Sequence, residues 1–518
     1  MTSDHVVGAG RDLSVHISFL FSAIICHGAA PRDFVVSTII PIPKKKNGNL
    51  SDSENFRGIA LCTIFSKVFD NIILNKYRDK LCTSELQFGF KQNNSTHMCT
   101  MILKETISYY CTNKTPIFCT FLDASKAFDR VNYVKLFRLL LKRELPLCII
   151  RTLINMYTGQ LIRVSWAGVL SQFFAAKNGV KQGGVVSPIL FCVYIDDLLL
   201  ELSDSGVGCY IGLNFCGAVA YADDIVLICP TPAAMRRLLK ICDDFALLYD
   251  ISFNANKSKF LVVVPSKWRS LCSCFNQCRF TIGGKLIEKV DSYPHLGHII
   301  SVNSDDTDDV KHRRSHFMGQ VNNVLCFFSK LDIFVKIKLF KSYCTSLYGS
   351  ELWSLDCEAV DSFCCAWRTA LRRLLRLPFN SHSFFLPLLT STLPVLDEIY
   401  RRSARFILSC LYSSSNLVRS LSWYGVGYAR YNSIIGKNSL IICDYFGWSI
   451  DDFLINNVNR SNIFFEQYFI RNLTQETVSM SMSLFELICL RENISVFVPD
   501  NFLNKKDIEL LIKFISTN

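Results

Sequence analysis

The chain has 518 residues, a formal net charge of +12 and a hydrophobic fraction of 50%. This length predicts about three domains, and so many hydrophobic residues exclude a globally disordered chain. The excess of basic residues favours a polyanionic partner. The apolar run 13–26 is too short to cross a bilayer, and Asp12 before it is the wrong flank for a secretion signal. We therefore expect an intracellular protein that has no membrane partner.

The first expected element with chemical interest is a basic β-hairpin. The β-branched run 35–43 leads into Lys44, Lys45 and Lys46 and an Asn-Gly turn, and the returning strand carries Arg57. Lys44 and Arg57 would lie on opposed strands, which is a geometry that can hold phosphate groups. Lys45 or Lys46 could take the place of Lys44, and a purely solvated tip remains the alternative.

A carboxylate is expected at the end of the next strong strand. A helix over 63–80 and another that opens near Ser95 precede this strand, which covers 117–122. The strand ends in Asp123, where the chain turns into a further helix. A carboxylate in this place is well positioned to bind a metal ion, although it could equally cap the helix.

A glycine-rich loop is expected at 179–188. It contains Gln182 and Gly183, and Pro188 then opens a helix in its first turn. Glycines let a backbone approach a flat ligand closely, but the same residues could simply form a turn.

Two adjacent carboxylates, Asp223 and Asp224, lie between apolar stretches at 218–220 and 225–228. Each stretch predicts a short buried strand, so the pair is expected at the turn of a hairpin. An ordinary acidic turn is the alternative, since Asp is common in turns. If the strand that ends in Asp123 is a neighbour, the three carboxylates converge and can bind two divalent ions. Together with the basic hairpin and the glycine loop, this set describes templated nucleotidyl transfer better than hydrolysis.

The segments that follow carry weaker signals. An amphipathic helix at 233–250 precedes Lys257 and a strand at 260–264. Cys272, Cys274 and Cys278 could form half of a zinc site, but no convincing second half follows.

The pattern becomes helical from Asp305 onward. Before it, His295 and His298 flank a turn and could bind a metal, although turn histidines seldom do. A later basic helix face is either a solvated surface or a track for nucleic acid. This face is expected to carry Arg368, Arg372 and Arg376.

The order of these motifs resembles the reverse transcriptase of non-LTR (LINE-like) retrotransposons. The resemblance covers roughly residues 13–300 and continues less specifically to about residue 390. The matching stretches are Asn55-Phe56-Arg57-Gly58, Gln87-Phe88-Gly89-Phe90, Phe121 to Asp129, Gly179 to Phe191, Tyr221-Ala222-Asp223-Asp224 and His295-Leu296-Gly297.

The resemblance implies a role for each matching residue. Asp123, Asp223 and Asp224 would be catalytic and would bind two Mg²⁺ ions, with Mn²⁺ as the alternative metal. Phe128 would be the steric gate that leaves no room for a ribose 2′-hydroxyl. The incoming dNTP would contact Lys44, Arg57, Phe128, Gln182, Gly183 and Lys257. The primer grip would contain Leu296 and Gly297.

The resemblance also implies a fold and an activity. The fold is expected to be α+β, with a right-hand polymerase palm and fingers over 1–300, a helical thumb and connection over 301–390, and a helical C-terminal region over 391–518. The expected activity is RNA-directed DNA polymerisation, with an RNA template, a DNA primer and dNTPs as partners and the nucleus as the site of action.

Several alternatives to this reading stay open. Elements of this class usually carry an endonuclease before the polymerase, and we expect this chain to lack one. An RNA-directed RNA polymerase and an intron-maturase relative are related alternatives. An inactive remnant that only binds nucleic acid is the alternative of a different kind.

Overall fold

The chain divides into two units, each with dense internal contacts. The first unit draws on residues 1–99, 116–262 and 268–290, and the second on 100–115, 263–267 and 291–518. The structure is a computed structural model, and it describes residues 3–455 apart from 46–47, 125, 266–274, 276, 382, 384 and 391.

A five-stranded sheet forms the centre of the first unit, with the strand order β14-β11-β3-β10-β9. Strand β10 pairs antiparallel with both β3 and β9, whereas β14 runs parallel to β11. The sheet is therefore antiparallel at its centre and mixed at one side. Its strands are β3 (Ile117–Asp123), β9 (Ala218–Tyr221), β10 (Asp224–Cys229), β11 (Lys259–Val263) and β14 (Glu288–Lys289).

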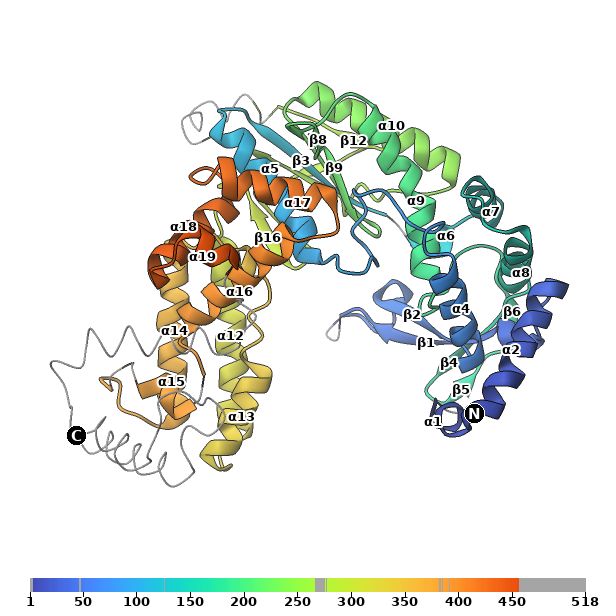
Figure 1. The fold of residues 1–518 in the computed structure, drawn as a ribbon, viewed down its shortest axis with the longest axis horizontal. Helices are drawn as coiled ribbons and strands as arrows, with labels where there is room; N and C mark the ends of the chain where they lie inside the picture. The colour runs from blue at the N-terminus through green and yellow to red at the C-terminus, as the bar shows by residue number, and fades with distance from the viewer. Residues whose placement is uncertain are drawn as a thin grey trace. The chain divides into compact units, whose positions relative to one another are not determined.

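The central strands β3 and β10 are buried along almost their whole length. Helices α9 (Ser187–Asp204) and α10 (Pro232–Tyr249) pack against β9 and β10 and against each other (Figure 1). Strands that are covered on both faces consist of continuous apolar runs, which explains why β3 and β10 show no alternation in the sequence. The burial of each strand ends at an acidic residue, Asp123 in β3 and Asp224 in β10.

A second sheet of the first unit contains the predicted basic hairpin. Its strand order is β2-β1-β4-β5, and β6 also pairs with β4. Strands β1 and β2 are antiparallel and place Ile42 opposite Arg57, while β4 runs parallel to β1. The strands are β1 (Val36–Pro43), β2 (Phe56–Leu61), β4 (Leu161–Trp166), β5 (Val169–Leu170) and β6 (Phe174–Ala175).

Helices and short strand pairs complete the first unit. The predicted helix over 63–80 begins after Thr63, whose hydroxyl accepts a hydrogen bond from the Ser66 amide, and it ends at Lys76. The remaining elements are α1 (Ser3–Gly8), α2 (Gly10–His27), α3 (Arg32–Val35), η1 (Ser53–Asn55), α4 (Ile64–Lys76), α6 (Ala127–Arg130), α7 (Tyr133–Lys142), α8 (Leu147–Thr158), β7 (Tyr210–Ile211), β8 (Asn214–Phe215), β12 (Thr281–Ile282) and β13 (Lys285–Leu286).

The second unit is mostly helical and has an aromatic core. The rings of Phe317 and Trp367 stack with their centroids 4.9 Å apart, and Phe340 and Phe363 meet the same indole edge-on or tilted. The unit contains the later part of α5 (Thr96–Thr112), the hairpin β15 (Ser292–His295) and β16 (His298–Ser301), and helices α12 (Thr307–Phe327), α13 (Ile333–Tyr343), η3 (Ser350–Leu352), α14 (Glu358–Leu375), α15 (Phe385–Thr390), α16 (Val395–Leu411), α17 (Asn416–Trp423), η4 (Tyr424–Tyr428), α18 (Ile434–Phe446) and α19 (Ile450–Ile455).

The predicted basic face of α14 is shorter than the sequence suggested. Helix α14 ends at Leu375, and Arg376 is its C-cap with a left-handed backbone. The Arg372 guanidinium donates hydrogen bonds to the Ser381 carbonyl, so it serves local structure. The prediction that Arg376 continues the helix face of Arg368 and Arg372 is therefore wrong.

Two further sequence predictions fall partly on residues that the structure does not describe. Residues 456–518 of the predicted C-terminal region lie outside the described residues, as do Cys272 and Cys274 of the proposed half zinc site. Among the residues that are described, no helix combines the length and the apolar character needed to span a membrane.

Candidate active site

The Asp-Asp pair lies at a tight turn between β9 and β10, as the sequence predicts. Strand β9 ends at Tyr221, and β10 begins at Asp224, so Ala222 and Asp223 form the connection. Ala222 has a positive φ of 56°, which is uncommon for a residue with a Cβ atom. The turn therefore needs support from the surrounding structure.

Gln87 supplies this support from a distant part of the sequence. Its side chain is fully buried, and its Oε1 accepts hydrogen bonds of 2.8 Å from the amides of Ala222 and Gly89. Its Nε2 donates to the Ala222 carbonyl at 3.3 Å. The Phe88 amide also donates to the Ala220 carbonyl at 2.8 Å. The Gln-Phe-Gly-Phe stretch thus fixes the backbone of the acidic turn.

A glycine is required beside this turn. A Cβ atom on Gly89 would lie 2.5 Å from the Ala222 nitrogen, which is closer than real Cβ atoms come to backbone. The small side chain lets the two segments touch.

Asp123 joins the pair from the neighbouring strand. Strands β3 and β10 pair in a register that places Asp123 directly opposite Asp224. Burial raises the pKa of the Asp224 carboxyl to about 6, and repulsion from Asp223 and Asp123 adds to the rise. Burial also raises the pKa of Asp223, with a further rise from Asp123 and an opposing effect of Arg57. The three carboxylates are therefore close enough to repel one another.

Mutual repulsion of this kind is relieved by a bound cation, and carboxylate oxygens are the ligands that Mg²⁺ prefers. The donor set therefore fits a hard divalent ion. Within the described residues, no group of three or more His, Cys, Asp or Glu side chains is already gathered as a metal site. The carboxylates are neighbours that an ion would draw together.

Basic side chains lie beside the acidic edge. Arg57 of β2 is exposed and acts electrostatically on Asp223. Lys257 places its Nζ 4.0 Å from the Asp123 carboxylate, and its side chain is 64% exposed. Both cations are thus positioned to meet an anion that binds at this edge.

Lys44 follows β1 at the tip of the basic hairpin, where its Nζ donates to the Glu54 carbonyl at 2.9 Å. The Glu54 carboxylate pairs with Lys126 at 2.7 Å. The contact with Lys126 is the main reason that the pKa of Glu54 is lowered, and Lys44 and Lys257 contribute to it. Three lysines therefore surround one exposed carboxylate, which occupies a place suited to an anionic ligand.

Phe128 lies in α6, just after the strand that ends in Asp123. Its ring stacks on Phe191 of α9, with the centroids 4.7 Å apart and the planes 18° from parallel. The stacking fixes the orientation of a half-buried ring near the carboxylates.

The glycine loop joins this region to the basic hairpin. The Gln182 carbonyl accepts a hydrogen bond of 2.6 Å from the Ala60 amide of β2. Gly183 has a φ of 111°, and a Cβ atom there would lie 2.7 Å from the Ala60 carbonyl oxygen. The Val180 amide donates to the Phe128 carbonyl at 2.8 Å. The loop thus contacts both the hairpin strand and the segment of Phe128.

The structure therefore brings together nine of the predicted residues in the first unit: Asp123, Asp223, Asp224, Lys44, Arg57, Phe128, Gln182, Gly183 and Lys257. Leu296 and Gly297 belong to the second unit.

Leu296 and Gly297 form the two-residue turn between β15 and β16. Both have positive φ angles, 48° and 79°, as a tight hairpin turn requires. The Leu296 carbonyl accepts a hydrogen bond of 3.2 Å from the Tyr348 hydroxyl, and the Gly297 carbonyl accepts one from Arg313. The Arg313 guanidinium also lies over the Tyr348 ring, 5.3 Å from its centroid. Two side chains thus hold a turn that would otherwise be strained at Leu296.

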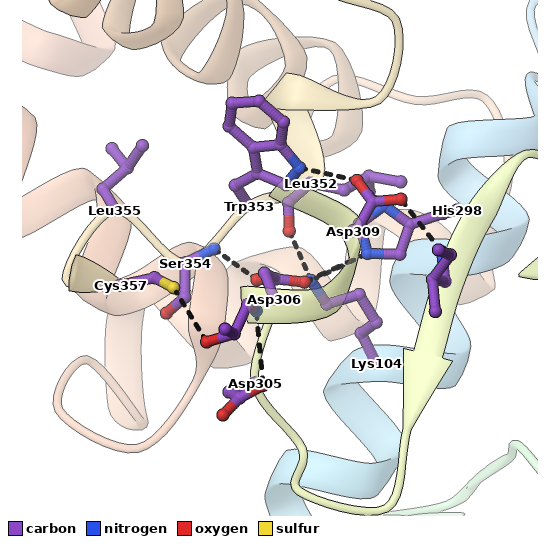
Figure 2. Close-up of polar contacts among 12 residues, drawn as sticks. Lys104, His298, Asp305, Asp306, Asp309, Leu352, Trp353, Ser354, Leu355 and Cys357 are labelled. Atoms are coloured by element: carbon purple, nitrogen blue, oxygen red, sulfur yellow. Dashed lines mark hydrogen bonds and ion pairs between the residues drawn. The ribbon is translucent and has the colours of Figure 1, made fainter. Parts of the chain in front are cut away.

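A buried ionic cluster supports the same hairpin (Figure 2). The Lys104 Nζ contacts the Asp306 carboxylate and the Leu352 carbonyl, each at 2.5 Å. His298 contacts Asp306 at 3.0 Å, and Asp309 accepts a hydrogen bond of 2.8 Å from the Trp353 indole. His298 is thus a structural residue of this cluster, which leaves the metal-ligand alternative without support.

The cluster is electrostatically balanced. Burial by itself raises the pKa of Asp306, but attraction to Lys104 and the contact with His298 outweigh it and hold this pKa below its usual range. Asp309 also accepts the Ile299 amide at 3.0 Å, which ties the start of α12 to β16. Removing one partner would leave a buried charge uncompensated.

Sequence reasoning missed three residues of the site: Gln87, Glu54 and Lys126. Gln87 lies in one of the matching stretches, but the resemblance assigns it no role. A glutamine between apolar residues is the signal that indicates a buried polar partner. Glu54 and Lys126 are far apart in the chain, and nothing in their local sequence indicates that they pair.

Comparison with known proteins agrees with this geometry. Residues 42–319 match the family model described as "Reverse transcriptase (RNA-dependent DNA polymerase)". The chain belongs to this family. The predicted resemblance to the reverse transcriptases of non-LTR retrotransposons is confirmed by its relatives, which come from retrotransposable elements.

Among these relatives, the Pol polyprotein of the type-1 retrotransposable element R2 of Nasonia vitripennis is 25% identical over 284 residues, which are 54% of this chain and 27% of the relative. The probable RNA-directed DNA polymerase from transposon X-element of Drosophila melanogaster is 24% identical over 372 residues, which are 67% of this chain and 38% of the relative. The chain thus matches less than half the length of either relative.

The solved structures that resemble this chain include apo telomerase from Candida tropicalis. Its TM-score is 0.38 at 13% identity, and the match covers 88% of this chain and 74% of the telomerase chain.

Proposed function

We propose that this chain is an RNA-directed DNA polymerase that adds deoxynucleotides to a primer 3′-hydroxyl on an RNA template. The observation that carries the proposal is the register of β3 and β10, which sets Asp123 opposite Asp224 beside the Asp223 turn. Membership of the reverse transcriptase family supports the same activity.

In this proposal the three carboxylates hold two Mg²⁺ ions, with Mn²⁺ as a substitute. When bound, the ions would stabilise the attacking and the leaving oxygen of the transfer. Gln87 acts indirectly, because its hydrogen bonds hold the turn that presents Asp223.

The basic side chains bind the triphosphate. Arg57 and Lys257, which lie next to the carboxylates, hold its charge at that edge, and Lys44 and Lys126 extend the positive surface around Glu54. Lys257 donates a proton to the pyrophosphate as it leaves.

The sugar and the base are selected by the other side of the site. The Phe128 ring, fixed against Phe191, excludes a ribose 2′-hydroxyl and so favours deoxynucleotides. The backbone of Gln182 and Gly183 lies under the nascent base pair, and Gly183 lets this loop approach the Ala60 carbonyl of β2 more closely than a Cβ atom would allow.

The proposal assigns each part of the chain to a polymerase domain. Palm and fingers cover 1–300, the thumb and connection cover 301–390, and a helical C-terminal region follows over 391–518. Leu296 and Gly297 grip the primer. The template is RNA, the primer is DNA, and the reaction takes place in the nucleus.

The test is Mg²⁺-dependent incorporation of dTTP on poly(rA)/oligo(dT) by the full chain, with Asp223→Asn as the site variant. We expect incorporation by the wild type and its loss in the variant. Incorporation that survives Asp223→Asn would refute the site assignment. A wild type that binds RNA with a steep salt dependence but never extends the primer would instead be an inactive remnant.

A further inference from the structure

An exposed aromatic and basic surface lies in the second unit, and none of its residues has been given a role above. Helix α17 and the single π-turn η4 continue one another over residues 416–428. The exposed positions along them recur every three or four residues, which is one face of a helix. We name this surface the aromatic face; it consists of Arg419, Trp423, Tyr424 and Tyr428 together with Arg430 and Tyr431, which directly follow the π-turn.

The opposite side of the same helix is a normal core side. Leu417, Val418 and Leu421 are at most 5% exposed, and Val426 of η4 is 1% exposed. The face that carries the aromatic rings is therefore directed away from the core by the register of the helix.

The rings on this face are unusually accessible. Tyr428 is 89% exposed, Tyr431 is 78% exposed and Trp423 is 40% exposed. Large aromatic side chains normally bury most of their surface, so a group of exposed rings indicates a binding surface. Every large hydrophobic side chain exposed between residues 412 and 431 is aromatic, and none is aliphatic.

The rings are held in place from several directions. Tyr424 and Tyr428 stack with their centroids 6.4 Å apart, and Tyr109 of α5 meets the edge of Tyr424 at 6.0 Å. The Trp423 indole donates to the Leu411 carbonyl at 3.1 Å. Helix α17 lies beside α5 in Figure 1, and the Ser108 hydroxyl of α5 donates to the Asn432 carbonyl at 2.8 Å. The face is thus a supported platform with its rings exposed.

The segment that forms this face carries basic residues and no acidic ones. No Asp or Glu occurs between Glu398 and Asp444, a stretch that contains Arg419 and Arg430. Arg419 is exposed and donates to the Ser413 carbonyl at 3.0 Å, and Arg430 donates to the Val426 carbonyl at 2.7 Å. Among the described residues, neither arginine forms an ion pair with a carboxylate; Arg419 is exposed and Arg430 half-buried, so Arg419 is the more accessible charge for an anionic ligand.

We propose that the aromatic face binds a single-stranded nucleic acid, with bases stacked on Tyr428, Tyr431 and Trp423 and phosphates held by Arg419 and Arg430. Stacking platforms with interleaved arginines bind single strands because every base has a flat face and every linkage a negative charge. A nucleic acid is favoured over a protein partner, because arginines without acidic residues beside them in the sequence complement a chain of phosphates. The face belongs to the second unit and the polymerase carboxylates to the first, and binding at the face does not depend on polymerase activity.

The test measures binding of a fluorescein-labelled oligo(U) of about 12 nucleotides, a length suited to one such platform, to the full chain. Saturating unlabelled primer–template duplex is present throughout, so that the polymerase site is occupied. We expect Tyr428→Ala to weaken binding about tenfold, which is the loss of one stacked base. Tyr428→Phe keeps the ring and should bind as the wild type does.

A matched control distinguishes this effect from a general one. Tyr343 on α13 is 61% exposed, and Tyr343→Ala should leave the affinity unchanged. Arg419→Ala should lower the slope of log affinity against log salt by about 0.7, the value for one contact to a single strand. An oligo(dT) of the same length shows whether the site takes DNA as well as RNA, and binding that depends on Tyr428 supports the proposal with either.

Two outcomes would overturn the proposal. One is equal affinity of the wild type and Tyr428→Ala, with melting temperatures that show both are folded. The other is photocrosslinking of a 4-thiouridine oligomer only to peptides outside residues 412–431. Absence of primer extension by the wild type would contradict the proposed polymerase and would leave the result at this site unaffected.

Discussion

Asp123 and Asp224 lie directly opposite each other on neighbouring antiparallel strands, although about a hundred residues separate them in the chain. Directly opposed residues in such a pair point to the same face of a sheet, so their carboxylates meet at one place. We therefore expect Asp123→Asn and Asp224→Asn each to lower dNTP incorporation by at least about a hundredfold, as loss of a ligand in an ion-dependent site does. Primer extension at fixed Mg²⁺ measures this. Asp204→Asn, at an exposed acid at the end of α9, is the control and should retain activity.

The raised pKa of Asp224 predicts a pH dependence of stability in the metal-free protein. A carboxyl whose pKa is about 6 when folded and near 3.8 when unfolded favours folding in its protonated form. Stability from this group is therefore absent above about pH 6 and grows as the pH falls towards 4. Asp224→Asn should raise the free energy of unfolding at pH 7.5 in EDTA by on the order of 1 kcal/mol after solvent screening, and should have no such effect at pH 4. Calorimetry of both proteins at the two pH values measures the difference, and an equal effect at both would contradict the electrostatic cause.

The stacking of Phe128 on Phe191 predicts control of sugar selection. Replacing the ring by Val opens space where a ribose 2′-hydroxyl would lie, and Phe128→Val should raise the use of rUTP relative to dTTP by about ten- to a hundredfold. The ratio of kcat/KM for the two nucleotides is the measurement. Phe191→Leu removes the support but leaves the gate, so a smaller relaxation is expected. Unchanged selectivity in Phe128→Val would show that the ring is not the gate.

Gln87 is predicted to be essential for activity because its hydrogen bonds hold the turn that presents Asp223. Gln87→Ala removes three buried hydrogen bonds and leaves the Ala222 and Gly89 amides without their acceptor, which costs about 2–3 kcal/mol of stability. We expect kcat to fall by more than about tenfold at temperatures where the variant remains folded, while KM for dTTP changes little. Gln92→Ala, at an exposed glutamine of the same region, is the matched control. A variant that loses stability but keeps full kcat would limit Gln87 to a role in folding.

A change in the Leu296–Gly297 turn is predicted to affect primer binding selectively. Gly297 has a φ of 79°, and a Cβ atom there would lie 2.9 Å from the Tyr348 ring. Gly297→Ala should therefore displace the turn and cost about 1 kcal/mol. We expect a several-fold rise in KM for primer–template with a smaller change in kcat.

A second glycine provides the control for this change. Gly319 lies inside α12, and a Cβ atom there meets nothing within 4 Å, so Gly319→Ala should be neutral or slightly stabilising. Steady-state kinetics with both variants separates a specific effect of the turn from a general effect of the unit. An unchanged KM for primer–template in Gly297→Ala would remove the turn from primer binding.

Much of the fold was predictable because the signals were local. The strand before Asp123, the hairpin around Asp223 and the basic hairpin of Arg57 all follow from runs of β-branched residues that meet turn residues. The predicted boundaries fell within a few residues, and the largest error was at α4, which ends at Lys76 instead of residue 80. Helix ends depend on hydrogen bonds to residues outside the helix, which a periodic pattern does not contain.

The errors on Arg376 and the omission of Gln87 have a common physical cause. A helix face is read from spacing, but Arg376 lies outside α14 because the chain adopts a left-handed conformation at this residue. Gln87 was visible as a residue, yet its role depends on a turn that is far away in the sequence. Both depend on backbone geometry that forms only in the folded chain.

The sequence by itself determined which chemistry this protein carries, because carboxylates, lysines and glycines at strand ends and turns are local features of the chain. Only the tertiary structure decided which of them meet: Asp224 with Asp123, Gln87 with Ala222, and Lys104 with Asp306. The same holds for the aromatic face, where burial of Leu417 and Leu421 decides that Tyr428 faces outward. The reason is that such contacts are selected by burial and strand register, which are properties of the packed chain.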